Sequence, residues 1–254
     1  MAFVEDFVTF KCTGRWLRAW FTIVLLCLST DVPAQNQIPA NNVNATQKRL
    51  IVNAMTDQEG AWVANAETNI YRSGTFENVT FGYSAKNDWD VNLSLLNVQI
   101  AGSNLSFQGE PFLNTTKTYQ LNSGLELAFG TLNGFTPGTA GPVQWLYFHF
   151  IDFQYTPFEG IELHGGPYLA NKAITGTSRQ VGLQTGIEID LLADRLALNM
   201  DYISGEHALA GANVNLTVNL TPLFQVYLGV LVPEANSGNE FAGIVGFNFS
   251  SHRL

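Results

Sequence analysis

The feature that most constrains the fold is a strict alternation of apolar and polar residues in segments of about ten residues, the length of a membrane-spanning strand. In the segment 213–221, NVNLTVNLT, valine and leucine alternate with asparagine and threonine. The same alternation recurs at 196–202, 181–191 and 119–129. Successive side chains of a β-strand point to opposite faces, so each segment predicts a strand with one apolar and one polar face. Helical periodicity is almost absent, and we therefore expect an all-β chain.

The strands of a soluble antiparallel sheet also alternate apolar and polar residues, so we use the composition to distinguish a soluble sheet from a membrane-spanning one. Only 13% of the residues are charged, about half the share in an average soluble domain. The outer face of a soluble sandwich meets bulk water, where lysine and glutamate are common. Here the polar faces carry mainly asparagine, glutamine, glycine, serine and threonine, with scattered acids. This composition favours a transmembrane barrel whose polar face lines a narrow lumen.

The segment 1–34 predicts a secretory signal peptide. Its apolar run at 19–28, AWFTIVLLCL, follows several basic residues and precedes the small residue Ala34. We expect cleavage after Ala34, because the run is shorter than the roughly 18 apolar residues of a retained membrane anchor. Both cysteines, Cys12 and Cys27, lie in this leader, so the exported chain is expected to contain no disulfide.

Turn residues divide the remaining chain into a flexible periplasmic lead-in at 35–60 and an outer-membrane barrel at 61–254. Connections rich in Asn, Asp, Pro and Gly alternate with looser ones, the pattern of short periplasmic turns and longer outer loops. We place the tight turns at 85–89, 113–117, 156–160, 191–196 and 220–224.

The segments between these connections predict twelve strands, within a range of 10 to 14, in an antiparallel up-and-down barrel. Their expected bounds are 61–72, 77–86, 88–100, 104–111, 117–131, 143–156, 160–170, 178–192, 195–204, 209–221, 223–233 and 239–250. The strand at 104–111 has the weakest pattern, but the alternation of short and long connections requires a strand there. An even number of strands puts both ends of the barrel domain on the periplasmic side.

Two stretches, 166–209 and 220–250, carry motifs that resemble a known class of protein. The motifs are a Gly-Pro-Tyr strand, a strand with Asp201, Tyr202 and a following Ser-Gly pair, a Leu-Thr-Pro turn, and a Leu-Gly strand ending at Pro233. They resemble bacterial outer-membrane β-barrels of the porin-like or transporter type whose substrate is unassigned. Members of this class usually end on an alternating strand; here Val245, Phe247 and Phe249 alternate before a final SSHRL.

The resemblance implies a location in the bacterial outer membrane, contact with its lipid, and passage of small solutes. It also implies assembly through periplasmic chaperones and the barrel-assembly machinery. It names neither a solute nor an oligomeric state. A formal net charge of -9 and the lack of any Lys/Arg-rich run argue against nucleic acid as a partner.

If the aliphatic faces meet lipid, the opposite faces supply a mostly acidic lumen. The expected pore-lining residues are Asp90, Glu126, Asp152, Glu162, His164, Glu188, Asp190 and Asp201. Such a lining attracts cations and repels anions. In the alternative, the acids are hydrogen-bonded to polar neighbours and fill a small plugged barrel, which acts through its outer loops.

A hydrolase is a further alternative, because sites on barrels are assembled from residues far apart in sequence. The sequence around the histidines contains no GxSxG or HExxH motif and no paired metal-ligand spacing. His164 shares a face with Glu162 and Tyr168, and a structural hydrogen bond explains it better than general-base catalysis. We predict no catalytic residue, no cofactor and no metal site.

The segment 143–156, VQWLYFHFIDFQYT, places a histidine and an aspartate among aromatic residues. An unbroken strand turns Trp145 and His149 toward lipid and Phe148 and Asp152 toward the lumen. A β-bulge near Phe150 would turn His149 inward, but it leaves backbone groups unpaired at membrane depth. We favour the unbroken strand, which gives a lumenal apolar patch suited to partly apolar solutes, composed of Leu146, Phe148 and Phe150.

Overall fold

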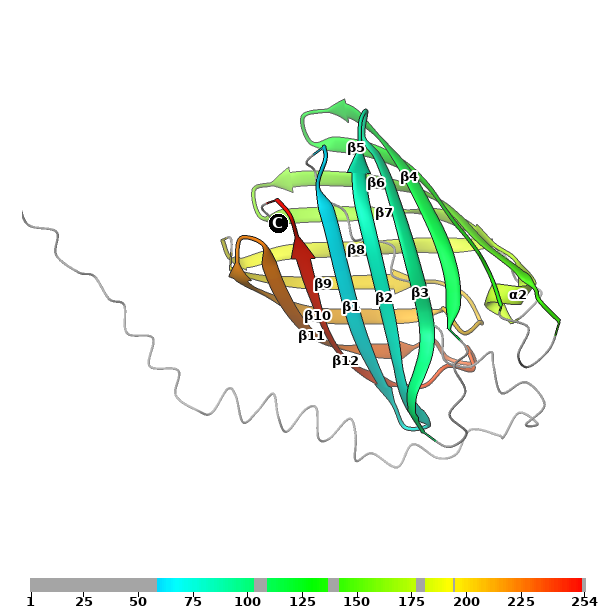
Figure 1. Cartoon of the computed structure of the whole chain (residues 1–254). Coiled ribbons are helices and arrows are strands. Elements are labelled where there is room, and N and C mark those ends of the chain that lie inside the picture. The colour runs from blue at the N-terminus through cyan, green and yellow to red at the C-terminus, as the bar shows by residue number, and fades with distance from the viewer. Residues whose placement is uncertain (1–58, 103–108, 137–141, 177–180, 194, 253–254) are drawn as a thin grey trace, which may run out of the picture. The chain divides into compact units, whose positions relative to one another are not determined.

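The computed structural model describes residues 59–102, 109–136, 142–176, 181–193 and 195–252, and these residues form a closed antiparallel barrel of twelve strands (Figure 1). The expected fold class and strand number are confirmed. The strands are β1 Trp62–Tyr71, β2 Gly74–Ala85, β3 Trp89–Gly102, β4 Glu110–Asn122, β5 Leu125–Phe135, β6 Trp145–Phe158, β7 Ile161–Ala170, β8 Val181–Leu192, β9 Leu196–Ile203, β10 Gly211–Thr221, β11 Phe224–Pro233 and β12 Ala242–Ser250. The expected signal peptide at 1–34 and nearly all of the lead-in at 35–60 lie outside the described residues.

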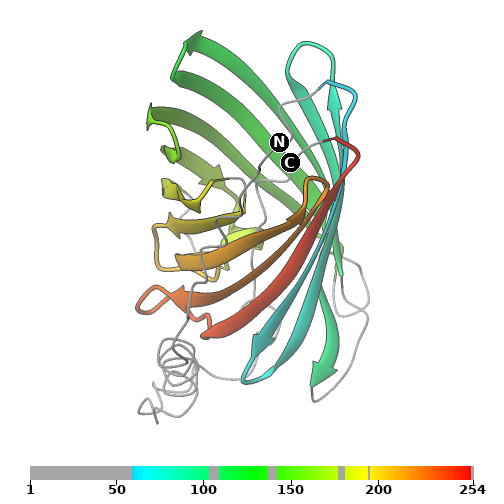
Figure 2. The same ribbon diagram turned by 90° about the vertical axis from the view of Figure 1, so that its left-hand side faces the viewer.

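Each strand pairs with its neighbours in the sequence, and β1 closes the barrel by pairing with β12 from Val63↔Ser250 to Tyr71↔Ala242. Figure 2 shows β12 beside β1 along the wall. Closure pairs both edges of the sheet, so no open strand edge is left to face lipid.

The two ends of the barrel differ in their connections. The connections after β2, β4, β6, β8 and β10 are short and lie together at what we call the short-turn end, where β1 begins and β12 ends. The opposite end, called the long-loop end, carries the tight turn between β1 and β2, the longer connections and the short helix α2, Lys172–Thr175 (Figure 1). In the turn after β2, Asn87 and Asp88 have φ of 58° and 54°, a left-handed conformation that Asn and Asp tolerate well.

The structure corrects one hairpin. The expected turn at 113–117 is wrong, because β4 runs through it from Glu110 to Asn122, while the expected strand at 104–111 lies mostly outside the described residues. The hairpin lies at Asn122–Leu125, inside the expected strand 117–131. Asn114 and Thr116 resemble turn residues in sequence, but they are buried on the inside face of the wall. The actual turn is stabilised by Asn122, whose Oδ1 accepts a hydrogen bond from the Gly124 N–H at 3.0 Å.

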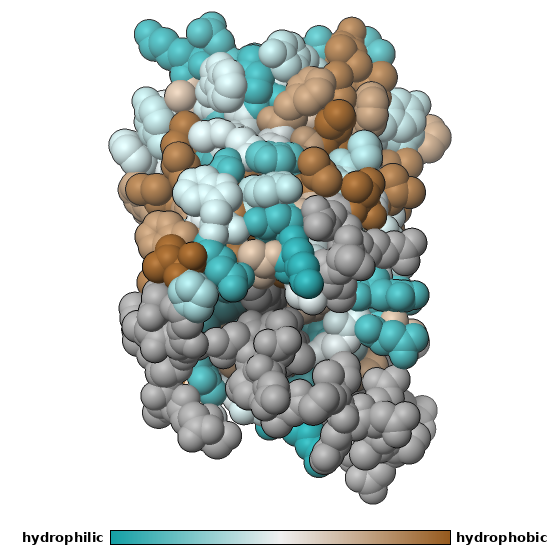
Figure 3. All heavy atoms as spheres, turned by 90° about the vertical axis from the view of Figure 1, so that its right-hand side faces the viewer, coloured by the Kyte–Doolittle hydropathy of each residue, from teal (hydrophilic) through white to brown (hydrophobic). Residues whose placement is uncertain are grey.

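The outer face of the wall is apolar, as a lipid-facing surface requires. Leu93 and Leu183 are each 61% exposed, and Leu228 is 57% exposed. Viewed from the side that carries α2, hydrophobic residues lie along the flanks of the described surface and hydrophilic residues lie between them (Figure 3). Among the described residues, no helix is both long and apolar enough to cross a membrane.

Candidate lumenal site

The faces of β6 follow from its unbroken pairing with β5 between Trp145 and Tyr155. Phe148 is 0% exposed and Asp152 is 3% exposed, whereas Trp145 and His149 are exposed on the opposite face. The expected register of this strand is confirmed, and no bulge occurs near Phe150. His149 therefore faces the membrane side of the wall.

The strand register also places the expected pore-lining residues. All of them lie on the inside face: Asp90, Glu126, Asp152, Glu162, His164, Glu188, Asp190 and Asp201. Their burial differs, since Asp90 and Asp152 are buried while Glu162, Glu188 and Asp190 are exposed. The exposed acids lie on β7 and β8 toward the short-turn end, so this part of the inside face is both acidic and accessible.

His164 connects two of these acids. Its Nε2 lies 2.9 Å from Asp201 Oδ1, and its Nδ1 lies 3.5 Å from Asp152 Oδ2. Gln184 completes the cluster by donating from Nε2 to Asp152 Oδ1 at 3.3 Å. The cluster joins β6, β7, β8 and β9 on the inside face, which supports the expected structural hydrogen bond for His164.

A glycine makes room for this cluster. Gly186 on β8 pairs with His164 on one side and with Asp201 on the other. A Cβ atom at Gly186 would lie 2.1 Å from His164 Nε2 and 2.5 Å from Asp201 Oδ1. Only glycine leaves space for the two side chains to meet above β8.

A second polar cluster was missed in the sequence. Glu67 on β1 is 1% exposed, and it accepts hydrogen bonds from Asn69 at 2.8 Å, Asn78 at 3.3 Å and the Tyr227 hydroxyl at 3.1 Å. The Tyr227 hydroxyl accepts in turn from Asn65 Nδ2 at 3.0 Å. The alternation along 63–71 would have placed Glu67 on the polar face, but its partners on β2 and β11 depend on barrel register.

Several asparagine side chains on the inside face keep unused acceptors. These oxygens are buried, and no described group donates a hydrogen bond to Oδ1 of Asn65, Asn69, Asn92, Asn114, Asn199, Asn213 or Asn215. A buried polar group without a partner costs free energy, and these oxygens are too enclosed for a solute in the lumen to reach. The inside wall is thus rich in acceptors, both amide and carboxylate.

The expected apolar patch is on the inside but is covered. Leu146, Phe148 and Phe150 pack in one buried cluster with Tyr168, Ile174 of α2 and Leu209 of the β9–β10 connection. Phe148 and Tyr168 stack with ring centroids 4.9 Å apart. Toward the long-loop end, the described side of the lumen is therefore narrowed by packed side chains.

The β9–β10 connection is held to the wall by a histidine that the sequence did not single out. His207 is 1% exposed, and its Nε2 is hydrogen-bonded to the Tyr168 hydroxyl, which also donates to the Ser204 carbonyl. Asn239 Nδ2 donates to the Ala208 carbonyl at 2.7 Å. These contacts fix residues 204–210 against the inside of the barrel mouth.

The histidines considered for hydrolysis do not form one site. His164 lies inside the wall, and His149 lies on its outer face. In the described parts of the chain, no group of three or more His, Cys, Asp and Glu side chains is arranged to hold a metal ion.

Comparison with known proteins gives structural relatives alone. No family model matches the sequence, and no curated protein matches it. The KdgM porin superposes with a TM-score of 0.54 at 13% identity over 76% of this chain and 99% of that one. The NanC porin superposes with a TM-score of 0.53 at 10% identity, over 76% of this chain and 100% of that one. An outer-membrane channel of Pseudomonas putida F1 superposes with a TM-score of 0.51 at 12% identity, over 80% of this chain and 100% of that one.

These relatives are outer-membrane porins and channels, and the resemblance seen in the sequence is confirmed at the level of fold. The expected outer-membrane location agrees with them and with the apolar outer face of the wall. At these identities the likeness concerns the barrel and not its solute. The chain forms a twelve-stranded barrel whose fold is similar to that of these bacterial outer-membrane porins.

Proposed function

We propose that the protein is an outer-membrane channel for small solutes, with a preference for cations and for neutral solutes that donate hydrogen bonds. One observation carries this proposal: apart from His164, every charged side chain on the inside face of the described strands is acidic. Glu188 and Asp190 are exposed there. Clustered charge of one sign inside a narrow lumen selects ions of the opposite sign.

The exposed acids also favour solutes that donate hydrogen bonds. A solute that loses water in a narrow passage must replace its lost hydrogen bonds. Hydroxyl, amide and ammonium groups can donate to the exposed carboxylates of Glu162, Glu188 and Asp190, whereas a carboxylate cannot donate. One KdgM structure is described in complex with oligogalacturonate, a polyanion, and the acidic wall of the present chain argues for a different kind of solute.

Selectivity in planar bilayers tests the proposal. Under a KCl gradient, the refolded protein should show a reversal potential of the sign expected for K⁺ preference. The double variant Glu188→Gln, Asp190→Asn should move this potential toward zero. Glu77→Gln is the matched control, because Glu77 lies on the outer face, where it accepts a hydrogen bond from Thr68 at 2.7 Å. Anion preference, or an absence of channels from a folded barrel, would contradict the proposal.

The packed long-loop end supports a second function, a structural or interaction barrel with a plugged lumen. The patch formed by Leu146, Phe148 and Phe150 is covered by Ile174 and Leu209, so it favours closure over passage of apolar solutes. In this case, liposomes containing the protein should not swell in any small neutral solute. Changes to the long loops should instead alter adhesion or envelope integrity.

A further inference from the structure

The hydrogen-bond ladder of the wall is interrupted between β6 and β7. The two strands keep one register along most of their length, but the pairs that would join Ile151 to Pro167 and Asp152 to Gly166 are missing. In the other pairings of the described strands, every missing pair coincides with a change of register. The interruption between β6 and β7 therefore has a different cause.

The cause is a proline in the interior of a strand. Pro167 is the seventh of the ten residues of β7, and β7 pairs with a strand on each side. Proline has no N–H, so within sheets it is usually confined to edges, strand ends and bulges. The other prolines of the described strands lie next to strand ends, at Pro111, Pro157 and Pro233.

The bond that Pro167 removes is the one to the Ile151 carbonyl. The Asn171 N–H, just after β7, donates to the Tyr147 carbonyl of β6 at 3.2 Å. In an antiparallel pair, every second residue of a strand bonds to the same neighbour. Counting back by twos from Asn171 leads to Pro167, which lies opposite Ile151 in this register. The Ile151 carbonyl therefore points to a residue that cannot donate.

Gly166 allows the two strands to approach closely beside this carbonyl. A Cβ atom at Gly166 would lie 2.0 Å from the Ile151 oxygen, so no side chain fits there. A backbone carbonyl without a donor costs free energy in a membrane, where water does not replace the missing bond. This part of the wall is therefore held less tightly than a regular ladder.

We call residues 150–152 of β6 and 166–168 of β7 the β6–β7 seam. Its ends are the intact pairs His149↔Leu169 and Phe153↔Gly165. These pairs are four residues apart, a length of about 13 Å along the strand. Over this length a regular ladder has two further hydrogen bonds, whereas the seam has at most the one that the Ile151 N–H donates. Loss of a single bond would open it.

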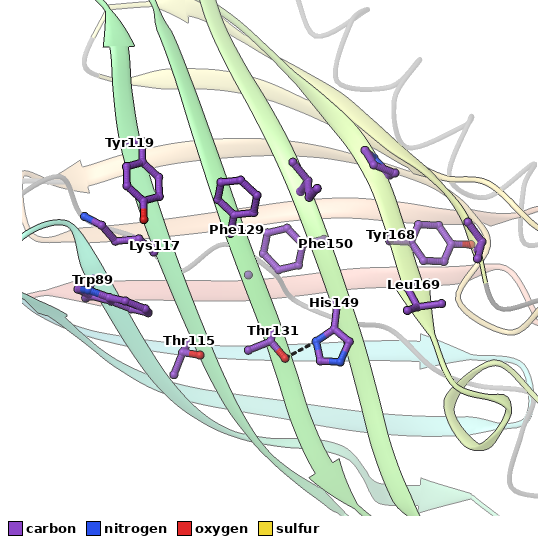
Figure 4. A pocket seen from close by; sticks show the side chains of 14 residues that line it. Trp89, Thr115, Lys117, Tyr119, Phe129, Thr131, His149, Phe150, Tyr168 and Leu169 are labelled. Carbon is purple, nitrogen blue, oxygen red and sulfur yellow. Dashed lines mark hydrogen bonds between the residues drawn. The ribbon is translucent and has the colours of Figure 1, made fainter.

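Apolar side chains lie on both sides of the seam. On the inside, Phe150 and Tyr168 belong to the buried cluster that contains Phe148. On the outside, a groove of about 680 Å³ has a mostly apolar lining that includes Ile151 and Pro167. Figure 4 shows Phe150 and Tyr168 among the residues around this groove. The seam thus separates an apolar cluster in the lumen from an apolar groove that faces the membrane.

We propose that the β6–β7 seam is a lateral opening, through which small apolar solutes pass between the membrane and the buried cluster around Phe148. A solute of this class exchanges one apolar environment for another and loses no hydrogen bonds on the way. A charged or strongly polar solute would have to leave water to take the same route. Lateral passage is separate from the conduction of cations along the lumen and does not depend on it.

Amide hydrogen exchange of the refolded barrel in detergent micelles, measured by NMR, tests whether the seam opens. Ile151 and Phe150 are neighbours at the same depth, but their N–H groups point to β7 and β5, respectively. After correction for intrinsic rates, Ile151 should exchange about fivefold faster, as the loss of one backbone hydrogen bond predicts. Pro167→Ala restores the missing donor and should bring the two rates together. Pro111→Ala, a matched change near a strand end, should leave them different.

Labelling of a thiol in the buried cluster tests passage. Both native cysteines lie in the expected signal peptide, so Ala170→Cys gives the exported chain a single thiol. Ala170 is 0% exposed and belongs to the cluster. The reagent is N-phenylmaleimide, which is small and apolar and dissolves in the membrane of liposomes that contain the protein. Adding Pro167→Ala should slow the reaction about fivefold, whereas adding Pro111→Ala should leave its rate unchanged.

Equal exchange of Ile151 and Phe150 in the wild-type protein would overturn the opening of the seam. A thiol that does not react, or a rate that Pro167→Ala leaves unchanged, would overturn lateral passage, since the reagent would then be excluded or arrive through the mouth of the barrel. Neither measurement uses ion current. Failure of lateral passage is therefore distinguishable from failure of the proposed cation channel.

Discussion

His164 on β7 and Asp201 on β9 meet across the intervening strand, with Nε2 2.9 Å from Oδ1. Gly186 of β8 lies beneath the contact, with no side chain to separate the two groups. The bond thus ties together strands that do not pair directly. Asp152 on β6 extends the same tie by one more strand.

Adding a methyl group beneath this bond should weaken the barrel. In Gly186→Ala the new Cβ would lie 2.1 Å from His164 Nε2, so both side chains must move and the bond is lost. We expect a loss of about 1 to 3 kcal/mol in the free energy of unfolding, measured by urea denaturation in detergent. Gly243→Ala is the control, since nothing lies within 4 Å of its added Cβ. Equal midpoints for the two variants would show that the bond contributes little.

The Phe150 ring depends on Gly130 in a similar way. A Cβ at Gly130 would lie 1.9 Å from Phe150 Cζ, so Gly130→Ala should displace the ring from its buried position and destabilise the barrel by about 1 to 3 kcal/mol. Adding Phe150→Leu should recover part of this loss, because the smaller side chain leaves room for the methyl group. A double-mutant cycle in the urea assay measures the coupling. Strict additivity of the two changes would argue against the contact.

Glu67 should be sensitive to removal because it is an acceptor for three donors. Glu67→Ala leaves the Asn69, Asn78 and Tyr227 donors without this carboxylate, and we expect a loss of about 2 to 4 kcal/mol in unfolding free energy. Glu77→Ala removes an acid from the outer face, where it bonds Thr68, and should cost less than about 1 kcal/mol. The thermal shift of the folded band in SDS gels gives an independent measure.

The contact between His207 and Tyr168 should limit conductance. His207→Ala removes the hydrogen bond that holds residues 204–210 to the inner wall, so the loop should move more and single-channel conductance should rise. His252→Ala is the control, because His252 follows β12 at the short-turn end. An unchanged current in His207→Ala would mean that this loop does not limit the passage.

Alternation was sufficient to predict which way side chains point. The β6 register, with His149 outside and Asp152 inside, follows from period-two geometry and from the cost of a bulge in lipid. The hairpin between β4 and β5 was not predictable in the same way. Residues 113–117 combine Asn, Thr and Lys, which suit both a turn and the polar face of a strand. Local sequence does not distinguish these environments.

Contacts between strands that are far apart in the sequence also could not be predicted from the sequence. Glu67 and Tyr227 are 160 residues apart, and only the closing register brings them together. Phe148 is packed against residues of α2 and of the β9–β10 connection. The alternation pattern does not predict that these connections fold into the barrel. The face of the sheet on which a residue lies follows from the local sequence, whereas its hydrogen-bond partners depend on the register between successive strands.

The closing pair β1 and β12 has a consequence for biogenesis. Val63 and Ser250 are neighbours in the wall although they lie near opposite ends of the barrel sequence. Until β12 is in place, β1 and β11 each expose a row of backbone donors and acceptors that hydrocarbon cannot satisfy. Insertion cannot proceed stepwise from the first hairpin. The C-terminal strand must therefore be present before the barrel moves into the hydrocarbon from water or from a complex with assembly proteins.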